Sequence, residues 1–307
     1  MMIYDLIIIG GGPAGITAGI YGVRKALKVL LITKDFIGQT GKAALIENYP
    51  GFPEISGTDL MRKFSDHVKK FSVDIRENDQ VKSLIKKEKL FEIETLKKES
   101  FQGRAVIIAS GRNSRPLKVP GEAKFTGKGV SYCSICDAVF FKNKNVAVIG
   151  GGNAGFCAAL DLLPYAAKIY ILELGPKITG DETNQQRIKD SGKAEMIVRA
   201  KVLEIKGKEA VEALVYQDLE TKEIKELKVG GVFIEVGSLP ATEFLKDLAE
   251  FNQLGEIVIN PRTCETKTPG LYAAGDVTDV KYKQIIVAAG EGTKAALSAY
   301  SFLQDLQ

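Results

Sequence analysis

The chain contains one short pattern twice, as "DLIIIGGGPAGITAGIY" at residues 5–21 and as "NVAVIGGGNAGFCAALD" at residues 145–161. Each copy is typical of a buried β-strand, a glycine-rich turn and a helix with small residues at helical spacing. In such a turn the first glycine allows a tight bend, and the second lets a pyrophosphate approach the backbone. The third lets the helix pack against the strand. We therefore predict an α/β protein with two Rossmann-like dinucleotide-binding domains.

Each copy also predicts a phosphate site, because the N-terminus of the following helix presents free N–H groups and the positive end of the helix dipole. A single glycine turn is weak evidence, since such turns occur without a ligand. Two matching copies indicate two dinucleotides, most economically a flavin and a nicotinamide. The expected contacts are Gly10, Gly12, Pro13, Ala14 and Gly15 in the first copy, and Gly150, Gly152, Asn153, Ala154 and Gly155 in the second.

A third segment, near the C-terminus, is expected to complete the first domain. A strand predicted over residues 271–274 ends in Gly275 and Asp276, whose carboxylate would accept hydrogen bonds from the ribityl hydroxyls of FAD. The Ala- and Gly-rich helix predicted from about Gln284 to Phe302 would pack against the isoalloxazine. The second domain is then an insertion in the first. We predict an FAD domain at residues 1–113 and 243–307 and a nicotinamide domain at residues 116–240, joined by Gly-, Pro- and Ser-containing crossings.

The composition is that of an ordinary globular protein, with 307 residues, 45% apolar residues, 26% charged residues and a net charge of +4. The charges are scattered along the chain, so we expect no nucleic-acid binding. No apolar run approaches the roughly 18 to 20 residues of a membrane helix. The N-terminus lacks the basic start and the long apolar stretch of a secretory signal. We expect no membrane association and a cytoplasmic location.

The cysteines favour redox chemistry over metal binding. In "SYCSICDA", residues 131–138, Cys133 and Cys136 are separated by two residues, and Asp137 follows directly. A structural zinc site would need four ligands, but the two other cysteines are isolated and His67 is the only histidine. A lone CxxC in a cytosolic chain is more typical of a redox dithiol, so we predict no metal. We assign Cys157, Cys264 and Phe140 to packing.

Six segments together resemble the low-molecular-weight thioredoxin reductase family, which includes the flavoprotein subunit of alkyl hydroperoxide reductase. The resemblance covers nearly the whole chain. A glutathione-reductase-like protein would instead have early redox cysteines and a histidine in its C-terminal tail. The segments are "GGGPAG" (10–15), "ENYPGFPEISG" (47–57), "CSICDA" (133–138), "GGGNAG" (150–155), "GLYAAGD" (270–276) and "YKQIIVAAGEG" (282–292).

The resemblance implies a role for each residue of the dithiol motif. Cys136 would be the sulfur nearest the flavin, Cys133 would attack the disulfide of a partner protein, and Asp137 would handle the proton. Thiol–disulfide exchange needs such an accessible thiolate, a resolving thiol and nearby proton transfer. The resemblance also implies a homodimer and a rotation between the two domains. Further cofactor contacts are implied for Gln39, Asn48, Gln284, Ile285 and Gly237.

The second copy favours NADH over NADPH. Glu173 ends the strand "KIYILELG", 23 residues after Gly150, where an acid would bond the ribose hydroxyls. NADPH-dependent members of the family have arginines there to hold the 2′-phosphate, whereas the nearest base here is Lys177. These features are similar to the NADH-using alkyl hydroperoxide reductase branch. The alternative is that Glu173 is only a surface acid at a strand end.

The predicted function is electron transfer from NADH through FAD to the Cys133–Cys136 disulfide and on to a partner protein. The peroxide-reductase branch carries N-terminal thioredoxin-like domains, which we expect to be missing because the first strand begins at Ile3. The partner would then be a separate thioredoxin-like protein, glutaredoxin-like protein or protein disulfide oxidoreductase. The alternatives are NADPH or ferredoxin as donor, an NADH oxidase, and a nucleotide sensor without catalysis.

Overall fold

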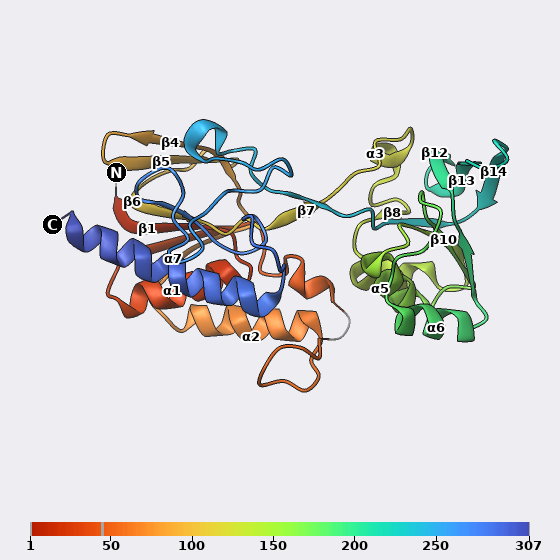
Figure 1. Ribbon diagram of the computed structural model, residues 1–307, viewed down its shortest axis with the longest axis horizontal. Helices are drawn as coiled ribbons and strands as arrows, with labels where there is room; N and C mark the ends of the chain where they lie inside the picture. The colour runs from red at the N-terminus through yellow and green to blue at the C-terminus, as the bar shows by residue number, and fades with distance from the viewer. Residues whose placement is uncertain (1, 44–45, 307) are drawn as a thin grey trace. The chain divides into compact units, whose positions relative to one another are not determined.

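The computed structural model describes residues 2–43 and 46–306, and its contacts divide the chain into two compact units (Figure 1). The outer unit comprises residues 1–113 and 239–307, and the inserted unit comprises residues 114–238. The segments that connect the units, β7 (Arg112–Ser114) and β16 (Ser238–Pro240), pair as a two-stranded sheet. Both units are α/β structures with parallel strands, which confirms the predicted fold class.

The outer unit is built on a seven-stranded sheet with the order β3-β2-β1-β6-β5-β4, to which β17 adds by pairing with β6. Strands β1, β2, β3, β6 and β17 pair in parallel, whereas β4 and β5 are antiparallel. Residues 6–9 of β1 are all buried, which is typical of a parallel strand covered on both faces. The strands are β1 (Ile3–Ile9), β2 (Val29–Thr33), β3 (Asp74–Glu77), β4 (Val81–Lys87), β5 (Leu90–Thr95), β6 (Ser100–Ile108) and β17 (Leu271–Ala273).

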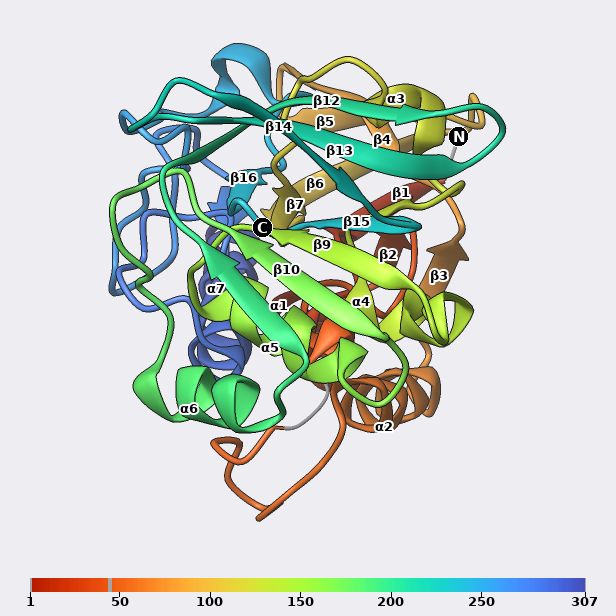
Figure 2. The same ribbon diagram turned by 90° about the vertical axis from the view of Figure 1, so that its right-hand side faces the viewer.

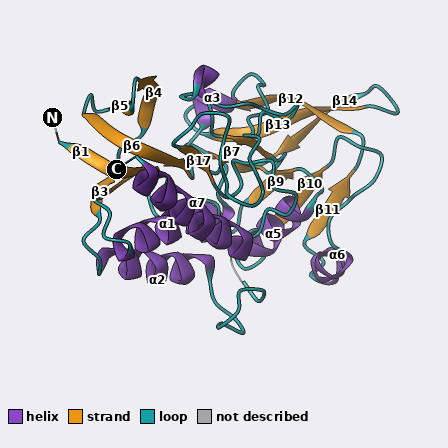
Figure 3. Ribbon diagram, turned by 60° about the vertical axis from the view of Figure 1, so that its left-hand side comes forward, coloured by secondary structure: helices purple, strands orange, loops and turns teal. Residues whose placement is uncertain are grey.

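Three long helices of the outer unit, α1 (Pro13–Arg24), α2 (Gly57–Lys69) and α7 (Ile285–Asp305), lie side by side (Figures 1 and 3). Ser56 begins α2 as its N-cap, since its side chain accepts the N–H of Asp59 at 3.0 Å. The last helix starts after Gln284, as expected, and ends three residues beyond the predicted Phe302. Short 3₁₀ turns occur at η1 (Thr40–Lys42) and η3 (Lys246–Leu248).

The inserted unit is built on a parallel sheet with the order β11-β10-β9-β15-β8, beside an antiparallel sheet β12-β13-β14 (Figure 2). The strands are β8 (Val130–Ser131), β9 (Asn145–Ile149), β10 (Lys168–Leu172), β11 (Ala194–Ile197), β12 (Ala200–Gly207), β13 (Val211–Asp218), β14 (Ile224–Lys228) and β15 (Gly231–Ile234). The helices are α3 (Glu122–Phe125), α4 (Ser134–Asp137), α5 (Asn153–Leu162) and α6 (Glu182–Asp190), with a 3₁₀ turn η2 (Ala138–Phe141).

Strand β9 separates two apolar cores, because successive side chains of a strand point to opposite faces. Val146 and Val148 pack with Phe156 of α5. Ala147 and Ile149 pack in the core that includes the antiparallel sheet. This double burial fixes the strand, and with it the glycine turn at its carboxyl end.

Within residues 2–43 and 46–306, no helix has both the length and the apolar content needed to cross a bilayer.

Candidate active site

The first glycine turn has free space beside one of its three glycines, whereas backbone atoms lie close to the other two. Gly10 has φ +119°, and a Cβ there would lie 2.1 Å from the carbonyl oxygen of Ala109. A Cβ on Gly15 would lie 1.8 Å from the carbonyl oxygen of Gly10, at the crossing of helix and turn. At Gly12 an added Cβ would meet nothing within 4 Å. The turn therefore leaves space at its second glycine, where a pyrophosphate would approach, and the residues present fit a bound dinucleotide.

The C-terminal segment meets this first turn directly. Gly275 follows β17 with φ +80°, and a Cβ there would lie 3.1 Å from the Cβ of Ala14. On α7, a Cβ at Gly292 would lie 2.1 Å from the carbonyl oxygen of Ala14. Gly292 therefore lets α7 cross α1 at close range. Several alanines of α7 are buried: Ala288, Ala289, Ala295, Ala296 and Ala299. That the helix also packs against the isoalloxazine stays a prediction.

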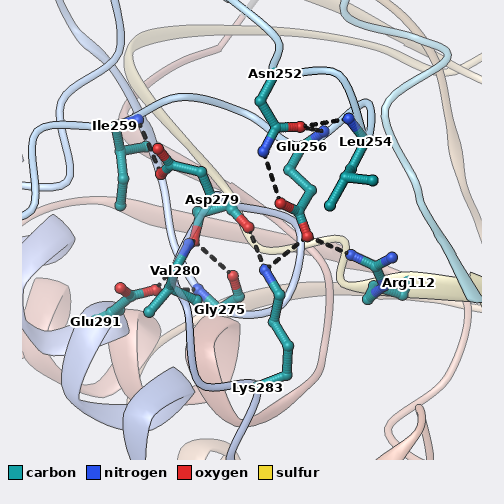
Figure 4. Close-up of polar contacts among 11 residues, drawn as sticks. Arg112, Asn252, Leu254, Glu256, Ile259, Gly275, Asp279, Val280, Lys283 and Glu291 are labelled. Carbon is teal, nitrogen blue, oxygen red and sulfur yellow. Dashed lines mark hydrogen bonds and ion pairs between the residues drawn. The ribbon is translucent and has the colours of Figure 1, made fainter.

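A charge cluster surrounds the loop that carries Asp276. Figure 4 shows the buried carboxylate of Glu256 between Arg112, at 2.8 Å, and Lys283, at 3.0 Å. Burial raises the pKa of Asp276, and the nearby positive charges of Lys283 and Arg112 oppose that rise. The charges of Arg112 and Lys283 thus offset those of two carboxylates, Glu256 and the predicted ribityl-binding acid Asp276.

A second buried acid supports the same loop. Glu291 of α7 is 5% exposed, and its Oε2 accepts the N–H of Gly275 at 2.8 Å and the hydroxyl of Thr278 at 3.4 Å. Burial raises the pKa of Glu291, although these hydrogen bonds oppose the rise. Neither Glu291 nor Glu256 is predicted from the sequence. A single acid within the apolar, small-residue run "IIVAAGEGTKAALSA" was a usable signal for Glu291.

The other predicted flavin contacts come from segments far apart in the sequence. Asn48 donates from Nδ2 to Oε1 of Gln284 at 3.3 Å, across 236 positions, and Ile285 is the first residue of α7. Gln39 donates from Nε2 to the carbonyl oxygen of Arg112 at 3.0 Å. The structure therefore brings Asn48 together with the start of α7, and Gln39 with the connecting strand β7.

The second glycine turn repeats the geometry of the first. A Cβ on Gly150, which has φ +116°, would lie 2.3 Å from the carbonyl oxygen of Glu235. A Cβ on Gly155 would lie 1.8 Å from the carbonyl oxygen of Gly150, and one on Gly152 would meet only Thr179 Oγ1, at 3.9 Å. The second turn is thus open at the same position and also fits a dinucleotide. Asn153 and Ala154, at the start of α5, are exposed beside it, and Gly237 has φ +97°.

Glu173 is tied to this second turn. It is half-buried at the end of β10, and its Oε2 accepts the N–H of Gly151 at 2.7 Å. Its Oε1 accepts the N–H of Gly175, also at 2.7 Å. Glu173 is therefore bonded to the backbone of the turn, while its contact with a ribose stays a prediction. Lys177 is exposed, and the structure adds Arg199, whose N–H donates to the carbonyl oxygen of Gly175 and whose guanidinium pairs with Glu220 at 2.7 Å.

Cys133 and Cys136 form a disulfide, with their Cα atoms 5.3 Å apart. Cys133 is the N-cap of α4, and its Sγ accepts the N–H of Cys136 at 3.2 Å, whereas Cys136 is exposed. Asp137 lines a cavity of about 230 Å³ that Phe140 and Lys144 also line. The dithiol motif thus lies at the surface of the inserted unit with an acid beside it.

Two packing assignments from the sequence are wrong. Cys157 is exposed on α5, and Phe140 is 68% exposed. Cys264, by contrast, is buried as predicted, and burial raises the pKa of its thiol to about 11. Among the residues that the structure describes, no group of three or more His, Cys, Asp or Glu side chains could hold a metal ion.

Comparison with known proteins agrees with this geometry. A family model described as pyridine nucleotide-disulphide oxidoreductase matches residues 4–292. The chain belongs to this family. The family implies FAD and a nicotinamide cofactor, which are the two dinucleotides that the two open turns fit.

Individual relatives and one solved structure show which members of the family the chain resembles. An alkyl hydroperoxide reductase subunit of Escherichia coli is 39% identical over 304 residues, covering 98% of this chain and 58% of the relative. A Bacillus subtilis protein named NADH dehydrogenase is 38% identical over 300 residues, with the same coverage. The chain thus spans a little over half the length of these curated relatives. Among solved structures, the thioredoxin reductase of T. acidophilum is 40% identical, with a TM-score of 0.90 and full coverage of both chains.

Proposed function

We propose that this chain is an FAD-dependent reductase that takes electrons from NADH, reduces its own Cys133–Cys136 disulfide and passes the electrons to a disulfide of a thioredoxin-like or glutaredoxin-like protein. The observation that carries the proposal is the CxxC disulfide at the surface of a unit that also holds a dinucleotide turn. The similarity to a thioredoxin reductase and to an alkyl hydroperoxide reductase subunit supports it.

FAD and the nicotinamide, when bound, supply the two electrons that open the disulfide. Two protons complete the reduction to the dithiol, and Asp137 is the acid beside the pair that can exchange them. The Cys133 thiolate then attacks one sulfur of the partner's disulfide, which releases one partner thiolate and leaves a mixed disulfide. Cys136 attacks Cys133 in turn, restores the Cys133–Cys136 disulfide and releases the second partner thiolate.

The local geometry suits Cys133 for the attacking role. Its Sγ accepts the backbone N–H of Cys136, and a hydrogen bond to the sulfur stabilises a thiolate more than a thiol. Cys136 follows at the exposed end of the same turn, within reach of Cys133 for resolution.

NADH is the proposed donor because of Glu173. Its carboxylate, fixed by the N–H groups of Gly151 and Gly175, keeps lone pairs that can accept bonds from ribose hydroxyls. The same charge would repel a 2′-phosphate. A base close by in the fold, Arg199, is already paired with Glu220.

A protein partner is favoured by apolar surface next to the dithiol. Val139 and Phe140, which follow the CxxC motif closely, are 55% and 68% exposed. Exposed aromatic and aliphatic side chains of this kind are typical of protein contacts. The proposed occupant is the surface around the disulfide of a thioredoxin-like protein.

The test is an anaerobic titration of the purified FAD-loaded protein with NADH and with NADPH, read by bleaching of the flavin absorbance. We expect rapid bleaching by NADH and much slower bleaching by NADPH. In Cys133→Ser, bleaching by NADH should persist, while reduction of a thioredoxin-like protein should fall by about 10³-fold or more. Unchanged partner reduction in Cys133→Ser would refute the dithiol route. Bleaching by neither nucleotide would favour another donor, such as ferredoxin.

A second candidate, an NADH oxidase, is favoured by the relative named NADH dehydrogenase. It would consume oxygen at the same rate in Cys133→Ser and in the parent, because the dithiol would have no part in turnover. Measuring oxygen uptake and partner reduction on the same preparations separates the two functions.

A further inference from the structure

Both neighbours of Cys133 in the chain are bonded to carboxylates. Tyr132 donates its hydroxyl to Oε1 of Glu122 at 2.5 Å. Ser134 donates its hydroxyl to Oδ2 of Asp161 at 2.6 Å. The two acids come from different elements, α3 and α5, so Cys133 is held from two sides.

Glu122 is a firm acceptor for the first bond. It is 5% exposed, and its carboxylate also accepts the N–H groups of Leu117, at 2.8 Å, and Lys118, at 2.6 Å. Burial raises the pKa of Tyr132, so its hydroxyl stays protonated and remains a donor. A buried carboxylate with three donors is fixed in place, and it fixes the tyrosine in turn.

Asp161 makes the second bond from the helix that begins at the nucleotide turn. It is half-buried near the C-terminal end of α5, and Ser134 is 6% exposed between the two cysteines. Burial raises the pKa of Asp161, while the hydrogen bond from Ser134 opposes the rise. Neither Asp161 nor Glu122 has a role in the exchange chemistry described above.

The backbone of Cys133 is held as well. Ser131 accepts the N–H of Cys133 at 3.0 Å and donates its hydroxyl to the carbonyl oxygen of Cys133 at 3.2 Å. Cys136, at the other end of the four-residue turn, is exposed. One sulfur of the pair therefore belongs to a fixed segment and the other to the more open end of the turn.

We infer that Glu122 and Asp161 are positioning residues that hold the Cys133 turn in the arrangement that closes the disulfide. The inference rests on the proposed function, in which this disulfide opens and closes in every cycle. Closing a disulfide within one turn depends on the effective concentration of one sulfur at the other, and a preorganised turn raises it. Removing the hydrogen bond to Glu122 or the one to Asp161 lowers that effective concentration and shifts the equilibrium toward the dithiol.

The test is the equilibrium of the pair with a glutathione redox buffer, measured on the full FAD-loaded protein without nicotinamide or partner. Thiols are trapped with N-ethylmaleimide, and mass spectrometry of the peptide containing both cysteines leaves Cys157 and Cys264 out of the count. In Ser134→Ala and in Tyr132→Phe we expect the equilibrium constant with glutathione to shift about tenfold toward the dithiol. This corresponds to a change of about 30 mV in the reduction potential of the pair. The measurement needs neither NADH nor a partner protein. Its result therefore tests the positioning role even if the protein proves to use another donor or another partner.

Matched variants separate positioning from general loss of stability. Asp218→Ala removes a carboxylate that pairs with Lys225, and Tyr170→Phe removes a tyrosine hydroxyl on β10, both in the inserted unit. We expect both to leave the equilibrium within about twofold of the parent. Asp161→Ala combined with Ser134→Ala should shift it no further than either change alone, because both remove one bond.

The conservative variant Asp161→Asn keeps an acceptor for Ser134 and guards against misfolding of the alanine variant. Its equilibrium should lie between those of the parent and Asp161→Ala. Parent-like equilibria in both Ser134→Ala and Tyr132→Phe would overturn the inference. An equal shift in the Asp218→Ala and Tyr170→Phe controls would overturn it too, since the effect would then be one of stability alone.

Discussion

The two glycine turns of this chain have nearly the same backbone but different surroundings. In both, a Cβ on the first or third glycine would collide with a carbonyl oxygen, and the second glycine faces open space. They differ in the acid that lies just after the next strand of each unit, β10 in the inserted unit and β2 in the outer unit. In the inserted unit Glu173 bonds to the N–H of Gly151. In the outer unit Asp35 bonds instead to Ile37 and Gly38, within its own loop.

A second difference lies in what completes each turn. The outer turn meets a segment from the far end of the chain, where Gly275 lies against Ala14 and donates its N–H to Glu291. Asp276 follows Gly275 directly in the chain. The glycine pattern is common to both turns, so the side chains around each turn have to distinguish the two cofactors. The proposed function places FAD at the outer turn and NADH at the inserted one.

The largest expected effect comes from filling the open position of each turn. At Gly12 and Gly152 an added Cβ would meet no protein atom closer than 3.9 Å, so Gly12→Val and Gly152→Val should both fold. Gly12→Val should weaken FAD binding by about 100-fold or more, because the side chain occupies the position of the pyrophosphate. Gly152→Val should retain FAD but lose reduction by NADH. Flavin content after purification and stopped-flow bleaching measure the two effects.

Gly192→Asn is the control, since an added Cβ there also meets nothing within 4 Å, its φ of +67° is one that Asn tolerates, and it lies between α6 and β11. It should leave FAD content and NADH reduction at the parent level. If Gly12→Val removed the response to NADH while FAD remained bound, the assignment of the two turns would be reversed.

A smaller effect is expected from the acid that distinguishes the turns. Glu173→Gln keeps an acceptor for Gly151 but loses the charge, so kcat/KM for NADH should fall by about 10-fold. The value for NADPH should fall less or rise, because the repulsion of its 2′-phosphate is gone. Steady-state rates with both nucleotides give the ratio. An unchanged ratio would mean that Glu173 only supports the turn.

The smallest effect concerns the buried acid at the outer turn. Because the folded-state pKa of Glu291 is raised, its stabilising contribution is fully present below the unfolded pKa and is lost as pH rises through the folded pKa. Glu291→Gln should therefore flatten the decline in stability of the FAD-free protein with rising pH. Part of the decline should persist in Glu291→Gln, because burial also raises the pKa of Asp276.

Melting temperatures measured across this pH range should differ from the parent by a few degrees at most, at about 2 °C per kcal/mol for a chain of this size. An unaltered pH profile would indicate that Glu291 has its ordinary pKa in the folded protein.

Much of the fold could be predicted because its signals are local. Runs such as "LIII" and "VAVI" are apolar at every position, which is typical of a strand buried on both faces, and each is followed at once by its turn. Errors arose where burial depends on neighbours. Cys157 and Phe140 are of residue types that are common in protein cores, but the elements packed around them leave both side chains exposed.

Within the candidate site, local features could be predicted for the same reason. The two turns, the position of Glu173 at a strand end and the spacing of the paired cysteines each depend on residues a few positions apart, or on one strand and its end, so the sequence alone was enough to predict where they lie. Other contacts became visible when the chain was folded: Gly275 with Ala14, Asn48 with Gln284, and Ser134 with Asp161. They join segments that are distant in the chain, and the strand order and helix packing, not any local pattern, bring them into contact.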